Sequence, residues 1–116
     1  AGDMCLKKVG TVLRGLTHRH SDVVARYGGE EFAIILPFAG VADVKLFAEK
    51  AVRAVREAGL LHEATERQEK VVTISAGCCT LIASGQQGEA ERLKERADKA
   101  LYDAKRNGRN RAEMSA

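Results

Sequence analysis

The sequence has no tryptophan and few other aromatic residues, with two tyrosines and three phenylalanines among 116 residues. Proteins that bind single-stranded nucleic acid usually stack bases on aromatic side chains. The scarcity of such side chains therefore favours a nucleotide over a polynucleotide as ligand. Only a basic cluster near the C-terminus, formed by Lys105, Arg106, Arg109 and Arg111, favours nucleic acid.

Long apolar runs are also absent. No run approaches the roughly 20 residues that cross a bilayer, and the N-terminus lacks the pattern of a secretory signal. A content of 45% hydrophobic and 30% charged residues with a net charge of +3 is typical of a small globular domain. We therefore expect one cytoplasmic domain over residues 1–116, with no membrane segment in this chain.

Neither a zinc motif nor a disulfide framework is present. The three cysteines, Cys5, Cys78 and Cys79, have no Cys-x-x-Cys spacing, and the adjacent pair is better explained as packing within a strand. His18 and His20 form a His-x-His, but no third ligand lies nearby in the sequence, so we interpret both as solvated residues at a helix end.

The most informative stretch is Tyr-Gly-Gly-Glu-Glu-Phe at residues 27–32. Strand-like apolar runs flank it at 22–26 and 33–36. Two such runs joined by a glycine-containing connection predict a β-hairpin, with the Gly-Gly pair at its tip.

The four central residues of this tip suit a phosphate ligand that carries a divalent metal. Gly28 and Gly29 permit positive φ angles and leave room for a ligand to approach the backbone. Glu30 and Glu31 then add two carboxylates, which are ligands that hard cations prefer. The alternative for a bare Gly-Gly-Glu-Glu is a solvated turn without a site.

Apolar periodicity and breakers predict the remaining elements. They are helices over 3–17, 41–58 and about 93–107, a largely buried strand over 71–82, and a weakly signalled strand at about 111–114. Residues 60–70 form a polar connection. This order gives an α+β fold, an α/β sandwich with helices against a mixed sheet.

Residues 26–37, Arg-Tyr-Gly-Gly-Glu-Glu-Phe-Ala-Ile-Ile-Leu-Pro, resemble the signature of GGDEF domains, the diguanylate cyclases, in the variant with Glu at the third motif position. Three other segments are similar to family segments and occur in the same order: Gly2-Asp3 with Leu6, Val72–Gly77, and Ala97–Asn110. Four matches over nearly the whole chain are far more specific than one short motif.

The resemblance implies the ferredoxin-like palm of nucleotidyl cyclases, with a mixed, mainly antiparallel sheet flanked by helices. It also implies a nucleotidyltransferase that condenses two GTP into cyclic di-GMP and two pyrophosphates as an antiparallel homodimer. The family's Phe-Asp-x-Asp-x-Phe-Lys strand is not in this sequence. We therefore expect a GGDEF domain truncated at its N-terminus, from a parent protein with a sensory or receiver domain.

Site residues at the hairpin follow from the same resemblance. It implies that Glu30 and Glu31 are catalytic and coordinate Mg²⁺ or Mn²⁺, and that Glu30 also assists deprotonation of the attacking hydroxyl. Gly28 and Gly29 would let the phosphates of GTP approach the turn.

Three further residues are implied to bind GTP. Asp3 would read guanine, because one carboxylate accepts from both N1–H and N2–H of the base; alternatively it only caps a helix. Lys105 and Arg109 would hold the β and γ phosphates. The alternative for this pair is a favourable interaction with a helix C-terminus.

Arg19 and Asp22 form an Arg-x-x-Asp whose aspartate lies six residues before Gly28. This offset matches the family's product-inhibition site, where the pair would bind cyclic di-GMP. An ordinary surface pair is the alternative.

A receptor module that binds cyclic di-GMP without making it is the main functional alternative. The chain lacks the family's metal-binding aspartate, its Phe-Lys pair and the asparagine that shares guanine recognition with Asp3. We therefore expect the 116 residues alone to turn over GTP weakly or not at all, and the parent protein to do so readily.

Overall fold

The computed structural model describes residues 3–17, 19, 21–28, 31–60 and 71–115. Its elements, in chain order, are α1 (Asp3–Gly15), β1 (Val23–Gly28), β2 (Glu31–Ile35), α2 (Val41–Glu57), β3 (Ala76–Cys78), α3 (Glu89–Arg106) and β4 (Ala112–Met114). The α+β class is confirmed, as are the hairpin and the weakly signalled terminal strand. No helix among the described residues has the length and apolar character needed to cross a membrane.

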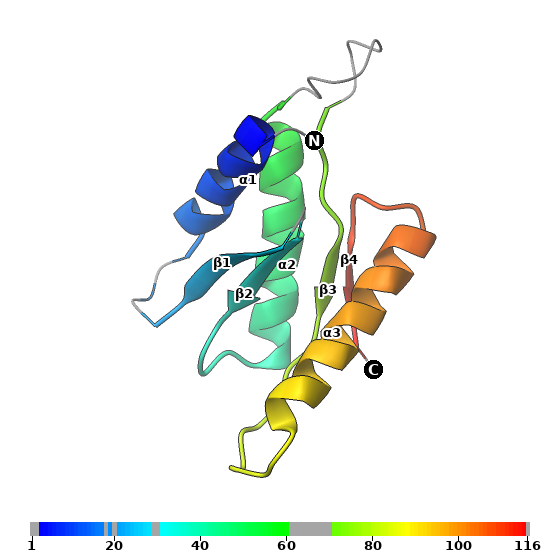
Figure 1. Ribbon diagram of the computed structural model, residues 1–116. Helices are drawn as coiled ribbons and strands as arrows, with labels where there is room; N and C mark the ends of the chain where they lie inside the picture. The colour runs from blue at the N-terminus through cyan, green and yellow to red at the C-terminus, as the bar shows by residue number, and fades with distance from the viewer. Residues whose placement is uncertain (1–2, 18, 20, 29–30, 61–70, 116) are drawn as a thin grey trace.

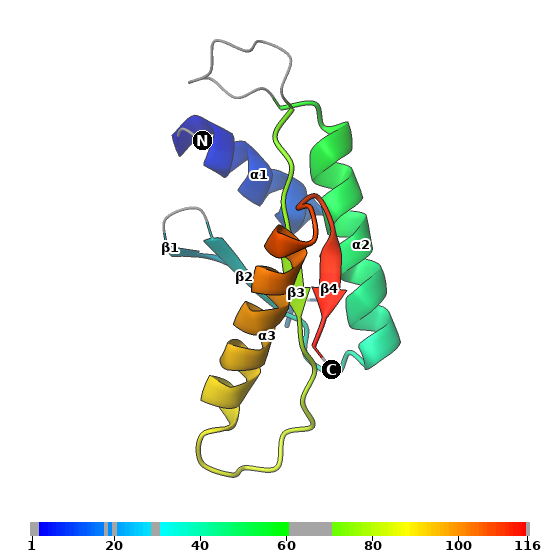
Figure 2. The same cartoon turned by 90° about the vertical axis from the view of Figure 1, so that its right-hand side faces the viewer.

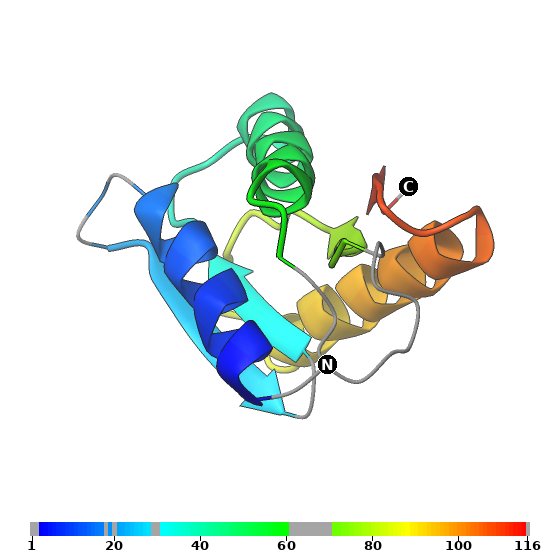
Figure 3. The same cartoon turned by 90° about the horizontal axis from the view of Figure 1, so that it is seen from above.

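The hairpin of β1 and β2 lies against α1 (Figure 3). Its strands are antiparallel, with Val23 opposite Ile35 at one end and Gly28 opposite Glu31 at the other. At Gly10 of α1, a Cβ atom would lie 3.2 Å from Cε1 of Phe32. The missing side chain at Gly10 therefore lets α1 approach the hairpin closely enough to cover the ring of Phe32.

The main core lies between α1 and α2 (Figure 1), and side chains of the hairpin pack against it. Cys5, Val9 and Leu13 recur at intervals of four on α1 and are buried. They meet Ala51 and Val55 of α2, and Val55 has no exposed surface. The apolar periodicity of both helices is thus satisfied by one shared core.

The second strand pair, β3 and β4, is parallel and lies between α2 and α3 (Figure 2). The predicted buried strand over 71–82 is too long, because β4 supplies only residues 112–114 as pairing partners. Beyond Cys78 the chain leaves the pair, and Ile82 is 92% exposed. A strand extends only as far as its hydrogen-bonded ladder.

The four strands of the described residues form two separate pairs, β1 with β2 and β3 with β4. Each strand therefore has a neighbour on one side only within this part of the chain. The expected mixture of parallel and antiparallel strand pairing is present, since one pair is antiparallel and the other parallel.

The helix predicted from about residue 93 begins four residues earlier, at Glu89. The Glu89 carboxylate accepts hydrogen bonds from the hydroxyl and the N–H of Ser84 and from the N–H of Gln86. These bonds lower the pKa of Glu89, with the Ser84 hydroxyl as the largest cause. The loop before α3 is thereby tied to the first residue of the helix.

Candidate functional site

The hairpin turn carries the predicted metal and phosphate residues. One extra residue, Tyr27, interrupts the register of β1 between Arg26 and Gly28. Such a bulge bends a strand and re-aims the residues that follow it. Glu31, the first residue of β2, is exposed. Gly29 and Glu30 lie outside the described residues.

Glu31 is suited to a divalent cation because its carboxylate is solvent-accessible and has no hydrogen bond or ion pair within the described residues. A complete metal site is not formed there by the described residues: no group of three or more His, Cys, Asp or Glu side chains among them lies close enough to hold an ion. The predicted second ligand, Glu30, lies outside this set.

Asp3, the predicted guanine-reading residue, is the first residue of α1. Figures 1 and 2 show this end of α1 on the same side of the molecule as the hairpin turn. Gly10 of α1 packs against the ring of Phe32 in β2, and this contact fixes α1 relative to the hairpin. The structure thus places Asp3 on an element that is braced against the strand carrying Glu31.

Lys105 and Arg109, the predicted phosphate-binding residues, lie at the end of α3 and are both exposed. The N–H of Arg109 donates to the carbonyl of Ala104 at 2.9 Å, which closes the turn after the helix. Arg109 and Asn110 both have left-handed backbones, with φ of 63° and 49°. Neither Lys105 nor Arg109 has a side-chain partner within the described residues, so both cations are available to a ligand.

The end of the hairpin at which β1 stops and β2 begins lies on the opposite side of β3 and β4 from the C-terminal end of α3 (Figure 1). No hydrogen bond or ion pair within the described part of the chain joins Glu31 to Lys105 or Arg109. The structure therefore shows no direct contact between the predicted phosphate-binding residues of α3 and the described carboxylate of the hairpin.

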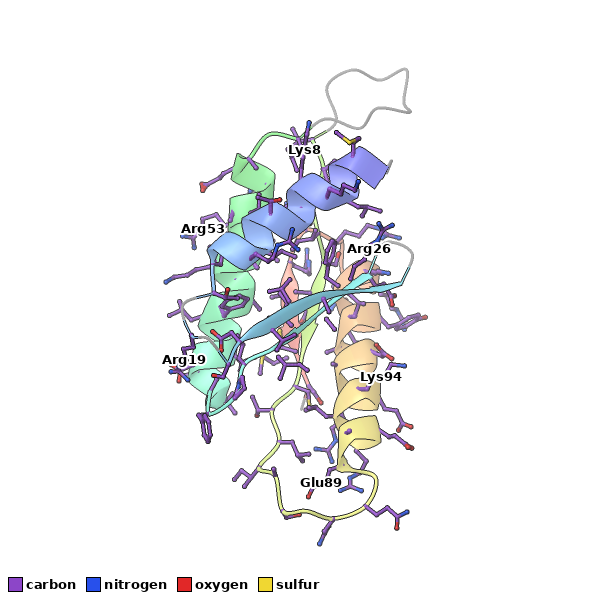
Figure 4. The ribbon with its side chains drawn as sticks, turned by 60° about the vertical axis from the view of Figure 1, so that its left-hand side comes forward. Lys8, Arg19, Arg26, Arg53, Glu89 and Lys94 are labelled. Atoms are coloured by element: carbon purple, nitrogen blue, oxygen red, sulfur yellow. The ribbon has the colours of Figure 1, made fainter. Side chains whose placement is uncertain are left out.

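Arg19 and Asp22 are joined in a short turn before β1. The Asp22 carboxylate accepts from the N–H of Arg19 at 3.3 Å, and the N–H of Asp22 donates to the carbonyl of Arg19 at 3.1 Å. The Arg19 guanidinium donates to the carbonyl of Pro37 at 3.0 Å. Sequence reasoning missed this Pro37 contact, since it joins residues 18 positions apart. Figure 4 shows Arg19 at the open end of the hairpin and Arg26 near the turn end.

The two predicted sites are therefore at opposite ends of β1. Six strand residues span about 17 Å at the usual rise per residue. The two predicted sites therefore share no described side chain within one chain.

The cysteines take no part in these sites. Burial raises the pKa of the Cys78 thiol to about 11, and the neighbouring charges of Cys79 and Glu49 add to the shift. A thiol with so high a pKa is protonated at neutral pH and is a poor nucleophile. The predicted packing within a strand agrees with the burial of Cys78 in β3, whereas Cys79 lies beyond the end of β3 and is half-buried.

Arg111 is separated from the residues with which the sequence grouped it. It lines an open depression together with Arg53 and Arg56 of α2, while Lys105 and Arg109 do not line it. The spacing of Arg53 and Arg56 signals a shared helix face, but the approach of Arg111 to that face follows from tertiary packing alone.

Comparison with known proteins gives a single family. The model described as diguanylate cyclase, GGDEF domain, matches residues 1–111. Diguanylate cyclase A of Treponema denticola is 36% identical over 115 residues, which cover 99% of this chain and 29% of that protein.

Solved structures agree with this match. The GGDEF domain of DgcB from Caulobacter crescentus, in complex with c-di-GMP, has a TM-score of 0.81 and 33% identity, covering 97% of this chain and 64% of that one. The active GGEEF domain of a diguanylate cyclase from Vibrio cholerae has a TM-score of 0.79 and 30% identity, covering 98% and 68%. This chain thus spans less than a third of its Treponema relative and about two thirds of these solved chains.

Proposed function

Because the chain belongs to the GGDEF family of diguanylate cyclases, we propose that its domain condenses two GTP molecules into cyclic di-GMP and two pyrophosphates. The observation that carries the proposal is Glu31, an exposed carboxylate directly after a bulged glycine turn. The relatives named as diguanylate cyclases support it, and one similar structure is an active domain with the same Glu variant.

In this proposal the hairpin holds metal and phosphate. Glu30 and Glu31 bind Mg²⁺ or Mn²⁺, and the absence of side chains at Gly28 and Gly29 lets the phosphates approach the backbone. The bound ion neutralises charge on the phosphates. The unpartnered carboxylate of Glu31 fits this role.

The remaining substrate contacts come from the two helices. Asp3 accepts from N1–H and N2–H of guanine, a pairing that adenine does not offer. Lys105 and Arg109 hold the β and γ phosphates, and the left-handed turn at Arg109 gives its side chain a fixed origin. Both cations also lie at the C-terminus of α3, where positive charge is favourable before any ligand binds.

Synthesis requires two copies, because each set of residues serves one GTP. In an antiparallel homodimer the 3′-hydroxyl of one GTP attacks the α-phosphorus of the other. Glu30 assists removal of the hydroxyl proton, a P–O bond forms, the bond between the α and β phosphates breaks, and pyrophosphate leaves. Repetition at the second pair of groups closes the ring. The protein contributes mainly alignment and charge neutralisation.

Product inhibition is proposed for Arg19 and Asp22. The guanidinium of Arg19 suits a phosphate or a guanine face, and Asp22 suits the donor edge of guanine. Their mutual hydrogen bonds and the Pro37 contact hold the pair in place before ligand binds. The position of the pair at the far end of β1 makes this site distinct from the GTP site.

The whole protein is expected to contain a sensory or receiver domain that brings two cyclase domains together, because the chain spans only 29% of the Treponema relative. GTP is a cytoplasmic nucleotide, so we place the reaction in the cytoplasm. A receptor that binds cyclic di-GMP without synthesis is the second candidate, favoured by the preformed Arg19 and Asp22 turn.

Incubation of the parent protein and of the 116 residues alone with GTP and Mg²⁺, followed by chromatography for cyclic di-GMP, tests the proposal: the parent protein should form cyclic di-GMP, and the 116 residues little or none. Glu31→Gln should lower synthesis by about 100-fold or more, because it removes a charged metal ligand. Glu95→Gln, on the exposed surface of α3, is the matched control and should have no effect. Cyclic di-GMP binding without synthesis under all metal conditions would identify a receptor, and absence of both would overturn the proposal.

A further inference from the structure

A second basic surface lies on the far side of the molecule from the β1–β2 hairpin. Arg53 and Arg56 are three residues apart on α2 and therefore share one helix face. Arg111 directly precedes β4, which packs beside α2 (Figure 2). The three arginines, with Glu49, line an open depression of about 350 Å³, and Arg53 extends outward from α2 in Figure 4.

Among the described residues that line this depression, three arginines outnumber one carboxylate, Glu49, so a positive charge remains. Arg53, Arg56 and Arg111 are exposed and make no ion pair there. Within the described residues their side chains donate hydrogen bonds to neutral acceptors: Arg56 Nη1 donates to Asn110 Oδ1 at 3.5 Å, and Arg111 Nε donates to the carbonyl of Arg109 at 3.2 Å. These bonds orient two guanidinium groups and leave their other N–H donors for a ligand.

We propose that this depression binds the linked phosphates of a small polyphosphate. Three guanidinium forks facing one carboxylate favour a ligand with several negative charges and planar sets of oxygens. The volume lies within the usual range for small-molecule sites. The apolar part of the lining consists of Val52 and Ala112, with no aromatic ring on which a base would stack.

The site is additional to the proposed GTP site. Lys105 and Arg109, which hold the phosphates there, do not line the depression. Its formation depends on the turn at Arg109 and Asn110, whose backbone carbonyl and side-chain amide receive the two hydrogen bonds. The two sites are thus neighbours along the chain with different side chains.

Backbone amide NMR shifts of the protein, titrated with inorganic pyrophosphate, test the inference. We expect saturable shifts in residues 49–56 and 111–112. Arg53→Gln and Arg111→Gln should each weaken binding about tenfold, because each removes charge-assisted hydrogen bonds. Glu49→Gln should tighten binding about threefold by removing a like charge. Arg96→Gln, on exposed α3, is the matched control for loss of one positive charge.

The Lys105→Ala variant distinguishes the two phosphate sites, because it should leave the pyrophosphate-induced shifts in α2 unchanged. Titrations with tripolyphosphate and ATP identify the source of the phosphates: equal affinities indicate a free polyphosphate, and tighter ATP binding indicates a nucleotide. Shifts confined to the end of α3, an Arg53→Gln variant that binds like the parent, or no saturation at millimolar pyrophosphate would each overturn the inference. The inference does not require these variants to lose cyclase activity. A failure of the polyphosphate inference can therefore be told apart from a failure of the proposed function.

Discussion

At the scale of single residues, Arg19 is held by the backbone rather than by an acidic partner. Its guanidinium donates to the carbonyl of Pro37, while Asp22 accepts from its N–H. We predict that Arg19→Ala raises the cyclic di-GMP concentration needed for half inhibition by at least about tenfold, because a charged donor to phosphate or base is lost. In the absence of added cyclic di-GMP, GTP turnover should remain close to that of the unsubstituted protein.

Initial rates of pyrophosphate release at increasing cyclic di-GMP measure this effect. Arg14→Ala, at an exposed position in the last turn of α1, is the control for loss of one arginine and should keep the parent's inhibition curve. Unchanged inhibition in Arg19→Ala would return Arg19 to the role of a loop-bracing surface residue.

The local structure of the hairpin was predictable from the sequence, whereas the roles of its residues stay predictions. The hairpin was predicted because a glycine-containing connection between two apolar runs is a local pattern, but the register shift at Tyr27 was not predicted. The contacts of Arg19 with Pro37 and of Arg56 with Asn110 were not predictable, because they join residues 18 and 54 positions apart. The sequence placed Arg111 in one basic cluster with Arg109 because the two are close in the chain. In the structure Arg111 lines a depression that Arg109 does not line.

At the scale of elements, Gly77 sets how closely α3 packs on β3. A Cβ there would lie 2.1 Å from the nitrogen of Leu101 and 2.3 Å from the carbonyl oxygen of Ala97. Both atoms are backbone atoms, so α3 itself would have to move. We predict that Gly77→Ala lowers the free energy of unfolding by about 3 kcal/mol, at the upper end for overpacking, and lowers Tm by about 10 °C or more.

Thermal and urea unfolding followed by circular dichroism measure the change. Gly15→Ala is the matched control, because a Cβ at Gly15 meets nothing within 4 Å. Gly15→Ala should change the free energy of unfolding little, or raise it slightly because alanine reduces the conformational entropy of the unfolded chain. A Gly77→Ala variant as stable as Gly15→Ala would show that the close approach of α3 is absent in solution.

Element types followed from periodicity, but strand lengths did not. Cys5, Val9 and Leu13 repeat with helical spacing and are buried as α1 requires. Residues 71–82 have the composition of a buried strand, yet apart from an isolated bridge at Val71 the described strand is Ala76–Cys78, because its partner β4 has three residues. Composition predicts what a segment can do in a sheet, and the partner determines how much of it pairs.

At the scale of the whole molecule, the resemblance predicted the arrangement of helices over a mixed sheet, and the comparison structures agree with it. The division of the described strands into two pairs was not predicted from local sequence. Which strands become neighbours depends on long-range contacts, which no local pattern contains. The predicted guanine, metal and phosphate groups are consequently spread over α1, the hairpin and α3, and each chain offers one set.

One set of substrate residues per chain makes the proposed reaction depend on protein concentration. Each GTP must meet the α-phosphorus of a GTP on another copy, so below the dimerisation constant the rate per chain should rise in proportion to concentration. Fusion to a parallel two-stranded coiled coil should remove this dependence, because a short tether gives an effective concentration of about 1 mM. At dilute protein we therefore expect synthesis per chain to rise by about 100-fold on fusion.

Initial rates of cyclic di-GMP formation by the complete cyclase domain over a wide range of protein concentrations, with and without the coiled coil, measure this dependence. The same fusion with prolines in the coiled coil is the control, because proline breaks the helices and leaves the cyclase domain unchanged. It should retain the concentration dependence of the unfused chain. A rate per chain that is constant over the whole range, and insensitive to the tether, would contradict the requirement for two copies and favour a single-chain site instead.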